Sequence, residues 1–335
     1  MPHIQYSPHG SKFTFIDLFG GIGGLRIPFE KIGGECVFSS EIDKYARQTY
    51  LKNFDYDTHQ ICEDITVIDP YDIPDHDLLV AGFPCQPFSS AGVSKKNALG
   101  QRHGFESDGD GTLFFNIEEI LRAKRPAAFV LENVKNLITH NNGKTFARII
   151  EGLTNTLGYW LPSPQYKLID AHHFSPQHRE RVVIVGFRDP SAFKWNNLIL
   201  PETDQHPIRE ILEKRTNRKY RLTKGVYTAL KRHAAKHKSR GNGFGYSLVS
   251  KDATQCRTLS ARYYKDGAEI LIDRGKYKLP RKLTPRECAR LMGFPDEFEI
   301  PVSDTQAYRQ FGNSVSIPVF DEVARIMKPH IVSTI

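Results

Sequence analysis

Cys85 is the side chain of this sequence best placed to act as a nucleophile. It lies between two prolines in GFPCQPFS, residues 82–89, directly after the apolar run 77–81. If that run is a buried strand, the thiol stands at its carboxyl end, where open α/β sheets bind their ligands. A nearby helix terminus or group of backbone N–H donors would lower the thiol pKa and favour the thiolate. The alternative is a small buried hydrophobe, which is how we interpret the other four cysteines.

An acid and a pair of arginines flank two further apolar runs. Glu132 follows the run 127–131, and QHRER, residues 177–181, leads into another run. Arg179 and Arg181 are two positions apart, so in a strand they point to the same face. Alone, such a pair is commonly a solvated strand edge. Together with a thiol and an acid at one edge of a sheet, it indicates a catalytic centre.

The first apolar run continues into a glycine-rich turn. In DLFGGIGG, residues 17–24, Gly21 and Gly23 stand where a strand would turn tightly into a helix and a ligand could approach the backbone. Glu41 follows the turn by about 20 residues, where an acid commonly binds ribose hydroxyls, and Asp64 comes one strand-sized interval later. Both acids could equally be solvated loop residues. No Gly-Lys-Ser/Thr follows the glycines, which disfavours phosphoryl transfer.

The elements that would hold these side chains alternate between strands and helices. Apolar runs predict strands at 13–19, 35–39, 77–81, 127–131 and 181–187, and helical patterns predict helices at 25–31, 44–53, 112–123 and 145–157. Helices that join strands in this way produce parallel pairing and cover both faces of the sheet. We therefore expect an α/β fold with a doubly wound, mostly parallel sheet and the candidate residues at one edge of it.

The pattern changes after residue 188. Residues 189–280 are rich in Arg, Lys, Tyr and Gly, include the basic run 231–240, and have few periodic apolar stretches. This composition predicts a second, smaller domain of irregular, β-containing structure. Helical patterns return at 284–292 and 305–329. The first of these begins with Thr-Pro-Arg-Glu, which offers a capping residue, a proline at the first helical position and a glutamate at the third.

The segment between Cys85 and Thr112 is longer than most loops inside a compact domain. It is polar, basic and rich in glycine. Long loops of this kind are commonly functional, and its place after a strand end predicts a lid over the site.

Composition and charge restrict the class of protein. The 335 residues are 39% hydrophobic and 25% charged, which is typical of a globular chain with room for two domains. Lys and Arg number 46 against 38 Asp and Glu, and the net charge of +8 favours a polyanionic partner. The five cysteines form no CxxC pair, and the first dozen residues are polar. We therefore expect a cytoplasmic protein, with no disulfide framework and no membrane segment.

The order of the motifs is more specific than any one of them. Between residue 13 and about residue 326 the chain carries DLFGGIGG, GFPCQPFS, ENV, QHRER, LTPRECARLMGFP and QFGNSV. In this order they resemble the DNA (cytosine-5)-methyltransferase family. The small domain, with RGNGFGY at 240–246 and TLSARYYKDGAEIL at 258–271, is most similar to the bacterial Dcm type.

The resemblance implies a Rossmann-like fold and S-adenosylmethionine as the cofactor, with S-adenosylhomocysteine as its product and no metal. The catalytic domain would comprise 1–188 plus 303–335, and the target-recognition domain 189–302. Phe19 and Ile42 would cover the two faces of the adenine, although relatives carry Trp at the second position. Glu41 would bind the ribose and Asp64 the adenine amino group. The full set of implied cofactor residues is Phe19, Gly21, Gly23, Glu41, Ile42, Asp64, Ile65, Pro84, Leu113 and Asn313.

The resemblance also implies the chemistry. The Cys85 thiolate would add to C6 of cytosine and make C5 able to take the methyl group. Glu132 would hydrogen-bond to N3 and stabilise the negative charge on the ring. Arg181 would hold O2, and Arg179 would orient the acid and the base. The target base must leave the duplex stack, and the segment after Cys85 would close over it.

Double-stranded DNA is the implied partner, bound by a monomer. Blocks of this kind imply a palindrome with an outer CC and GG framework, CCWGG first, with the inner cytosine methylated. A cognate restriction endonuclease would be encoded alongside. The implied DNA contacts are Ser89, Ser90, Arg240, Asn242, Gly243, Phe244, Tyr246, Arg257, Ser260, Arg262 and Tyr263.

Three alternatives remain open. One branch of the family modifies transfer RNA, but the basic small domain with its Gly and aromatic residues favours duplex DNA. An inactive DNA-binding homologue is disfavoured, because Cys85, Glu132 and both arginines stand where the chemistry needs them. The glycines and arginines of the small domain could also serve only to shape it and bind phosphates.

Overall fold

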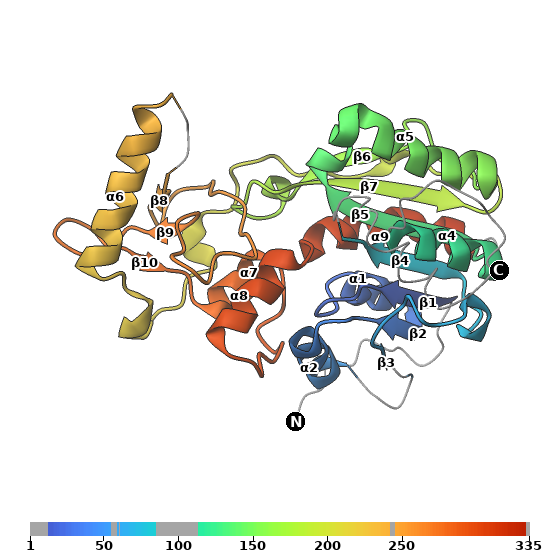
Figure 1. The fold of residues 1–335 in the computed structure, drawn as a ribbon, viewed down its shortest axis with the longest axis horizontal. Helices are drawn as coiled ribbons and strands as arrows, with labels where there is room; N and C mark the ends of the chain where they lie inside the picture. The colour runs from blue at the N-terminus through green and yellow to red at the C-terminus, as the bar shows by residue number, and fades with distance from the viewer. Residues whose placement is uncertain (1–12, 55–58, 60, 85–112, 242–244, 333–335) are drawn as a thin grey trace, which may run out of the picture.

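The computed structural model describes residues 13–54, 59, 61–84, 113–241 and 245–332, which form two lobes of unequal size (Figure 1). The large lobe contains a seven-stranded sheet, and the small lobe contains a three-stranded sheet beside a long helix. Cys85, the segment expected to form a lid, and Asn242 to Phe244 lie outside the described residues. Within the part described, no helix is long and apolar enough to span a membrane.

The strands of the large sheet lie in the order β3-β2-β1-β4-β5-β7-β6. They are β1 (Phe13–Leu18), β2 (Gly34–Ser40), β3 (Ile61–Cys62), β4 (Leu78–Gly82), β5 (Ala128–Val134), β6 (Lys167–Asp170) and β7 (Glu180–Phe187). The first five pair in parallel, which confirms the predicted mostly parallel sheet, whereas β7 runs antiparallel to β5 and β6. The start of β7 therefore lies at the same edge as the carboxyl ends of β1, β2, β4 and β5.

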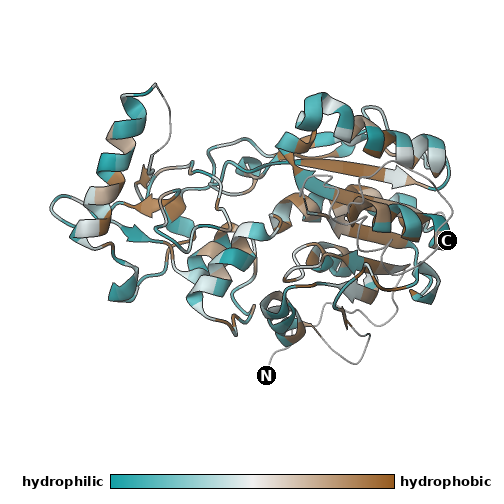
Figure 2. Cartoon of the chain, viewed as in Figure 1, coloured by the Kyte–Doolittle hydropathy of each residue, from teal (hydrophilic) through white to brown (hydrophobic). Residues whose placement is uncertain are grey.

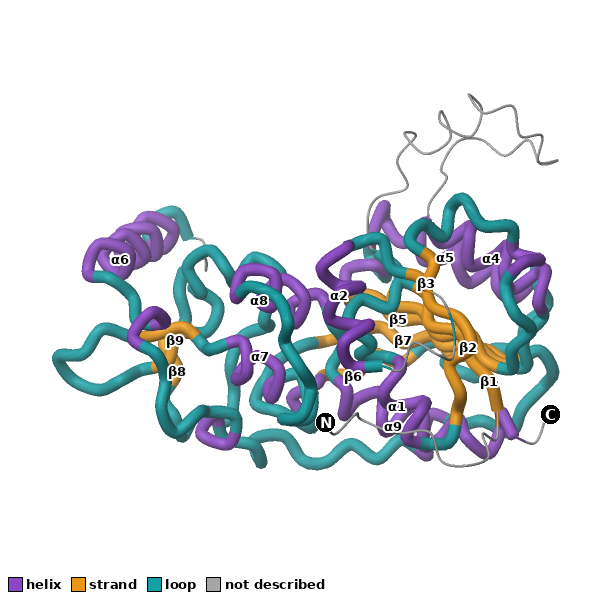
Figure 3. The backbone as a smooth tube through the Cα atoms, turned by 90° about the horizontal axis from the view of Figure 1, so that it is seen from below, coloured by secondary structure: helices purple, strands orange, loops and turns teal. Residues whose placement is uncertain are grey.

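Helices cover both faces of this sheet (Figure 3). One face carries α1 (Arg26–Lys31) and α9 (Ile317–Val332), and the other carries α4 (Leu113–Lys124) and α5 (Lys144–Glu151). A sheet buried on both faces needs nearly continuous apolar strands, and Figure 2 shows the central strands as strongly hydrophobic. α2 (Lys44–Asn53) follows β2 beside the small lobe.

Two predicted helices differ from the structure. The helix expected at 145–157 ends at Glu151, and Gly152–Thr156 forms a π-helical turn. A Cβ at Gly152 would lie 1.9 Å from Oε1 of Glu118, so any larger residue there would displace the Glu118 side chain of α4. The stretch expected at 305–329 is two helices, α8 (Asp304–Asn313) and α9. The chain becomes extended at Ser314, and a proline then occupies the first turn of α9, where it cannot continue a preceding helix.

The small lobe contains one element that the sequence did not predict. Its sheet, β10 (Arg281–Lys282), β9 (Leu271–Ile272) and β8 (Leu248–Val249), agrees with the β-containing domain expected. However, the basic run largely belongs to α6 (Lys224–Lys238), in which Leu230 is the one buried side chain. Figure 2 shows this helix as mostly hydrophilic. A helix that buries so little has almost no apolar periodicity for a sequence to reveal.

The connection between the lobes is well packed. α7 (Pro285–Leu291) begins with the predicted capping box of Thr284 and Glu287. Side chains of α7, α8 and α2, including Cys288, Phe311 and Tyr50, belong to one hydrophobic core. That core spans the division expected near residue 302.

Candidate active site

A pocket of about 930 Å³ lies between the carboxyl ends of β1, β2, β4 and β5 and the small lobe. Glu132, Arg179 and Arg181 line it beside the small-lobe residues 258–262. The structure therefore brings the expected catalytic acid, the arginine pair and the expected cofactor residues into one cavity. The cofactor residues that line it are Phe19, Gly21, Glu41, Ile42, Asp64, Ile65, Pro84, Leu113 and Asn313.

Glu41 is held in place by the backbone around it. The N–H of Gly21 donates to its Oε2 at 2.8 Å, and the N–H of Asp43 donates to its Oε1 at 2.7 Å. Burial raises the pKa of Glu41, and these hydrogen bonds oppose the rise. Beside it, the Ile42 side chain is 73% exposed. A fixed carboxylate next to an exposed apolar side chain suits a ligand with hydroxyl groups and an aromatic base.

Gly23 differs from the sequence-based expectation. It does not line the pocket, although it was expected to lie under the methionine part of the cofactor. Its φ is +84°, and a Cβ at this position would lie 2.2 Å from the ring of Phe54. Gly23 is thus required where the turn packs against Phe54, just after α2.

Asp17 is a residue that sequence reasoning did not select. It is fully buried at the end of β1 and lines the pocket, and its Oδ1 has no hydrogen-bond partner. The hydroxyl of Tyr50 donates to its Oδ2 at 3.4 Å, and burial raises the Asp17 pKa to about 7. An unpaired buried carboxylate oxygen, on a residue that lines a cavity, favours a cationic or hydrogen-bond-donating ligand. The sequence could have indicated Asp17 by its position at the start of DLFGGIGG. The acids that we selected, Glu41 and Asp64, both follow the glycines.

Glu132 and Arg181 form the polar centre of the pocket. Nε of Arg181 lies 2.8 Å from Oε1 of Glu132, and Glu132 is 8% exposed. Burial raises the pKa of Glu132, and the two arginines oppose the rise. The strand predicted at 127–131 continues to Val134, whose register partner is Arg181. The antiparallel pairing of β5 and β7 therefore brings the acid and the arginine together.

The chain just before Cys85 is anchored to this centre. Nδ2 of Asn133 donates to the carbonyl of Phe83 at 2.9 Å, and Phe83 is buried against Phe114. Pro84 lines the pocket. The described chain thus ends beside Glu132 immediately before the expected nucleophile.

Arg179 contacts groups other than those expected. It is 2% exposed and donates to the carbonyls of Leu259, Gly312 and Ser314 at 2.9, 3.0 and 2.6 Å. Burial lowers its pKa to about 9, and its Nε has no hydrogen-bond partner. It was expected to orient the acid, but Arg181 makes that contact. Arg179 instead joins β7 to the small lobe and to the end of α8.

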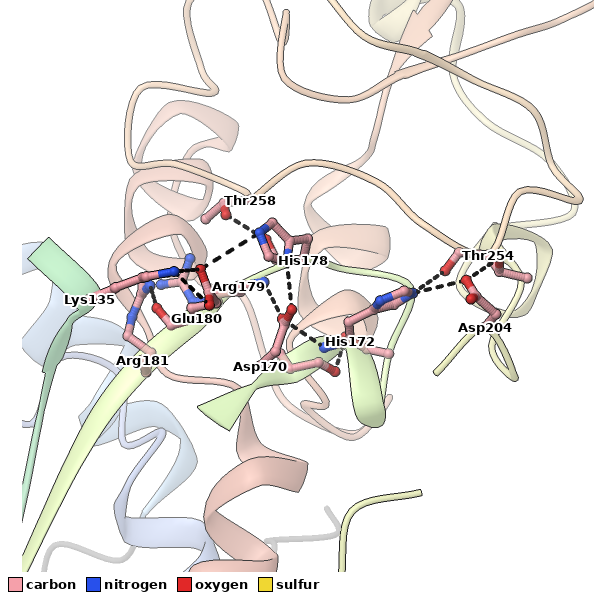
Figure 4. A network of polar contacts seen from close by, with 12 residues as sticks. Lys135, Asp170, His172, His178, Arg179, Glu180, Arg181, Asp204, Thr254 and Thr258 are labelled. Carbon is pink, nitrogen blue, oxygen red and sulfur yellow. Dashed lines mark hydrogen bonds and ion pairs between the residues drawn. The ribbon is translucent and has the colours of Figure 1, made fainter. Parts of the chain in front are cut away.

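A strap of small-lobe residues, 254–259, lies along residues 170–181 of the large lobe (Figure 4). The Thr258 hydroxyl donates to the carbonyl of His178 at 2.6 Å, and Nδ1 of His178 lies 2.5 Å from Oδ2 of Asp170. Asp170 also accepts from the N–H of Arg179 at 2.8 Å. These contacts fix the segment that carries both arginines against the start of the 258–271 block.

The residues expected to contact DNA lie in different environments. Ser260 and Arg262 line the pocket, and Arg257 is exposed with its guanidinium bonded to the carbonyl of Gly245. Tyr246 packs against Tyr227, and Arg240 is exposed just after α6. Ser89, Ser90, Asn242, Gly243 and Phe244 lie outside the described residues.

The expected DNA contact by Tyr263 is wrong in this structure. Its side chain is 0% exposed. Its hydroxyl donates to the carbonyl of Ile270 at 2.6 Å and accepts from the N–H of Leu283 at 2.8 Å. Residues 261–266 form a turn in which Arg262 is exposed, Tyr264 is half-buried and Tyr263 belongs to the hydrophobic core. Among the described side chains, no group of three His, Cys, Asp or Glu residues could hold a metal ion.

Known proteins resemble this chain over nearly its whole length. The family described as C-5 cytosine-specific DNA methylase matches residues 13–329. The chain is 50% identical to the DNA-cytosine methyltransferase of Escherichia coli (strain K12), over 97% of this chain and 79% of that protein. It is 49% identical to the type II methyltransferase M1.ScrFI of Lactococcus lactis subsp. cremoris, over 95% and 78% of the two chains. Its identity to the type II methyltransferase M.HpaII of Haemophilus parainfluenzae is 41%, over 94% and 88%.

A solved structure, that of S. pombe Dnmt2 methyltransferase, has the same fold, with a TM-score of 0.73 at 20% identity over 95% of this chain and 99% of that one. Membership of this family, with this fold, supports S-adenosylmethionine as the methyl donor. The pocket carries groups that fit it: a fixed carboxylate, an exposed apolar side chain and an unpaired buried acid. The chain belongs to the C-5 cytosine-specific DNA methylase family and is a DNA (cytosine-5-)-methyltransferase.

Proposed function

We propose that this enzyme methylates the inner cytosine of a CC/GG palindrome, CCWGG first, through a covalent adduct between Cys85 and C6 of a flipped-out base. The observation that carries the chemistry is the Glu132–Arg181 pair, which lies in one pocket with the glycine-rich turn and Glu41. The target assignment rests on the Dcm-type blocks of the small lobe. The 50% identity to a protein named DNA-cytosine methyltransferase supports cytosine in DNA as the base that is methylated.

In the proposed reaction the Cys85 thiolate forms a bond to C6, and the electron pair of the C5–C6 double bond moves through the ring towards N3. Glu132, whose pKa is raised by burial, donates its proton in a hydrogen bond to N3 and stabilises this charge. Arg181 orients Glu132 and presents its remaining N–H groups to O2. C5 then bonds to the methyl group as the bond from that group to the donor sulfur breaks, which would leave S-adenosylhomocysteine, and N3 returns its proton to Glu132. Loss of the C5 proton and departure of the thiolate restore the double bond of 5-methylcytosine.

S-adenosylmethionine supplies the methyl group from a sulfonium centre. We assign Glu41 to the ribose hydroxyls, Asp64 to the adenine amino group, and Phe19 and Ile42 to the two faces of the adenine. Asp17 is assigned here to the positive charge of the methionine part, because its buried Oδ1 is unpaired and the residue lines the pocket. Gly21 has a φ of +58°, and a Cβ at this position would have no atom within 4 Å, so the turn is open to the ligand.

Bisulfite sequencing of DNA from cells that express the wild type or Cys85→Ser tests both parts of the proposal. We expect methylation at the inner cytosine of CCWGG with the wild type and none with the variant. A methylome without a CC/GG framework would overturn the target and leave the chemistry intact. Methylation that persists in Cys85→Ser would overturn the adduct, and methylation confined to RNA would overturn the choice of duplex.

We also propose that the chain acts as a monomer, that residues 189–302 form the target-recognition domain, and that a cognate endonuclease accompanies it. The type II names of several relatives support the last point. If it is correct, DNA from cells expressing the enzyme resists cleavage by an endonuclease encoded beside its gene. Sedimentation at several concentrations, with and without duplex DNA, tests the monomer.

A further inference from the structure

Helix α6 carries five basic side chains and no acidic one: Lys224, Lys231, Arg232, Lys236 and Lys238. All five are exposed. The ion pairs that the structure describes in the small lobe involve other residues. By contrast, the exposed side of α9 mixes signs, with Glu322 paired to Arg325. A solvated helix face normally resembles α9, so α6 needs another explanation.

Two features of the charge on α6 disfavour the helix, although Lys236 and Lys238 in its last turn suit the helix dipole. Arg232 and Lys236 are four positions apart, and like charges at that spacing destabilise a helix by a few tenths of a kcal/mol. Lys224 lies in the first turn, which contains no acid to balance it. Moreover, α6 buries little apolar surface: Leu230 is its one buried side chain, in a small cluster against which half-buried Tyr227 packs. A partner that supplies negative charge would remove this cost.

The arrangement of the cations indicates the shape of that partner. At about 100° per residue, Arg232 and Lys236 lie on the side of the helix opposite the buried Leu230. Arg240 follows at the same four-residue interval, where the chain enters the 240–246 block assigned to DNA. Arg232 and Lys236 are thus about one helical turn, or about 6 Å, apart along the axis, and Arg240 continues the row just beyond the end of α6. Such a row matches closely spaced phosphates along a nucleic acid backbone better than a single small anion.

We propose that the outer face of α6, formed by Arg232 and Lys236, binds phosphates of duplex DNA beyond the base pairs that are recognised, with Arg240 continuing the contact just after the helix. The proposal rests on the proposed function, in which the small lobe reads a duplex. It adds a contact that carries no sequence information but holds the small lobe on the DNA. Lys231 and Lys238, seven positions apart, lie on a flank of the helix and take no part.

The matched pair of variants is Arg232→Gln with Lys236→Gln, and Lys231→Gln with Lys238→Gln. Each removes two charges from α6 and replaces exposed residues with a good helix former, which circular dichroism can verify. Binding is measured to a long duplex at several salt concentrations. We expect the outer-face variant to lower the salt slope by about 2 on cognate and unrelated sequences alike, and the flank variant to leave it unchanged.

A short duplex that ends close to the site provides the second measurement. It lacks the flanking phosphates, so wild type and outer-face variant should bind it equally, and methyl transfer at saturating long DNA should keep its rate. Equal slope changes in the two variants, or none in the outer-face variant, would overturn the proposal. So would a loss confined to structured RNA or to anionic vesicles. These experiments measure DNA binding and do not depend on methyl transfer. A failure of the proposed target or chemistry would appear in bisulfite sequencing and not in these binding measurements.

Discussion

The large-lobe wall of the pocket and helix α6 use charge in opposite ways. Asp17, Glu132 and Arg179 are buried, and each contacts particular groups that fix its position. The cations of α6 are exposed and lie outside the described ion pairs. A charge that is fixed in a buried site can act on one atom of a substrate. An exposed charge can bind the phosphates of a nucleic acid but does not recognise its sequence. The two regions should therefore respond differently to mutation.

The largest effect should follow from Cys85→Ser. The variant should lose methyl transfer because only the covalent step needs the thiolate, while cofactor and DNA binding remain near wild type. On DNA with 5-fluorocytosine at the target, the fluorine cannot leave as a proton would, so the wild type should accumulate a stable adduct. Peptide mapping should locate that adduct on Cys85. An adduct on another cysteine would assign the nucleophile elsewhere.

Glu132→Gln should lower the rate of methyl transfer by about 10²–10⁴-fold, because the variant cannot give a proton to the ring. The sign of the pH dependence follows from burial, which raises the Glu132 pKa. The protonated acid is the active form, so the wild-type rate should fall as pH rises through that pKa, and the variant should lose this limb. Glu118→Gln is the control, since Glu118 is also buried with a raised pKa but lies outside the pocket. A rate within tenfold of wild type for Glu132→Gln would contradict its role.

Asp17→Asn should separate ligand binding from stability. The variant should bind S-adenosylmethionine more weakly by about 1–3 kcal/mol, as measured by calorimetry. Burial raises the Asp17 pKa from 3.8 to about 7, so folding favours the protonated form and this stability is lost as pH rises towards 7. Asn avoids the loss, and the variant should be more stable than wild type above pH 7 by up to a few kcal/mol. Unchanged affinity would show that Asp17 does not bind the cofactor. Lower stability of the variant at pH 8 would show that burial of the charged acid is not unfavourable.

The catalytic residues of the large lobe could be predicted because both their residue types and their positions are informative. Cys85, Glu132 and Arg181 stand next to apolar runs, and a parallel sheet brings such positions to one edge. The sequence could not predict that Arg181, and not Arg179, contacts Glu132. This arrangement depends on the antiparallel β5–β7 register and on carbonyls of the small lobe and α8, which lie more than 75 residues away in sequence.

The small lobe gave weaker signals. Helix α6 buries Leu230 alone, so its sequence shows charge but no helical pattern. Tyr263 lies between exposed Arg262 and half-buried Tyr264, and nothing in the local sequence marks it as the residue that enters the core. In the fold its hydroxyl bonds to the backbone of Ile270 and Leu283, which lie later in the chain. The small-lobe strands have two residues each, which is too short for a strand pattern to appear in the sequence. The long buried strands of the large lobe do produce such a pattern.

The smallest expected effects concern two arginines of the small lobe that the sequence treats alike. Arg257 is exposed and bonded to Gly245 of the 240–246 block, whereas Arg262 lines the catalytic pocket. Arg257→Ala should relax discrimination at one G·C pair by about 1–3 kcal/mol, because Arg contacts to guanine carry sequence information. Arg262→Ala should instead weaken binding equally on all sequences and lower the salt slope by about 1, as expected of a phosphate contact beside the flipped nucleotide. Binding to a panel of single-base-pair variants of the site, repeated at several salt concentrations, distinguishes the two. Relaxed discrimination in Arg262→Ala would make it a base-reading residue, and uniform weakening in Arg257→Ala would leave sequence recognition to the backbone groups of the neighbouring loops.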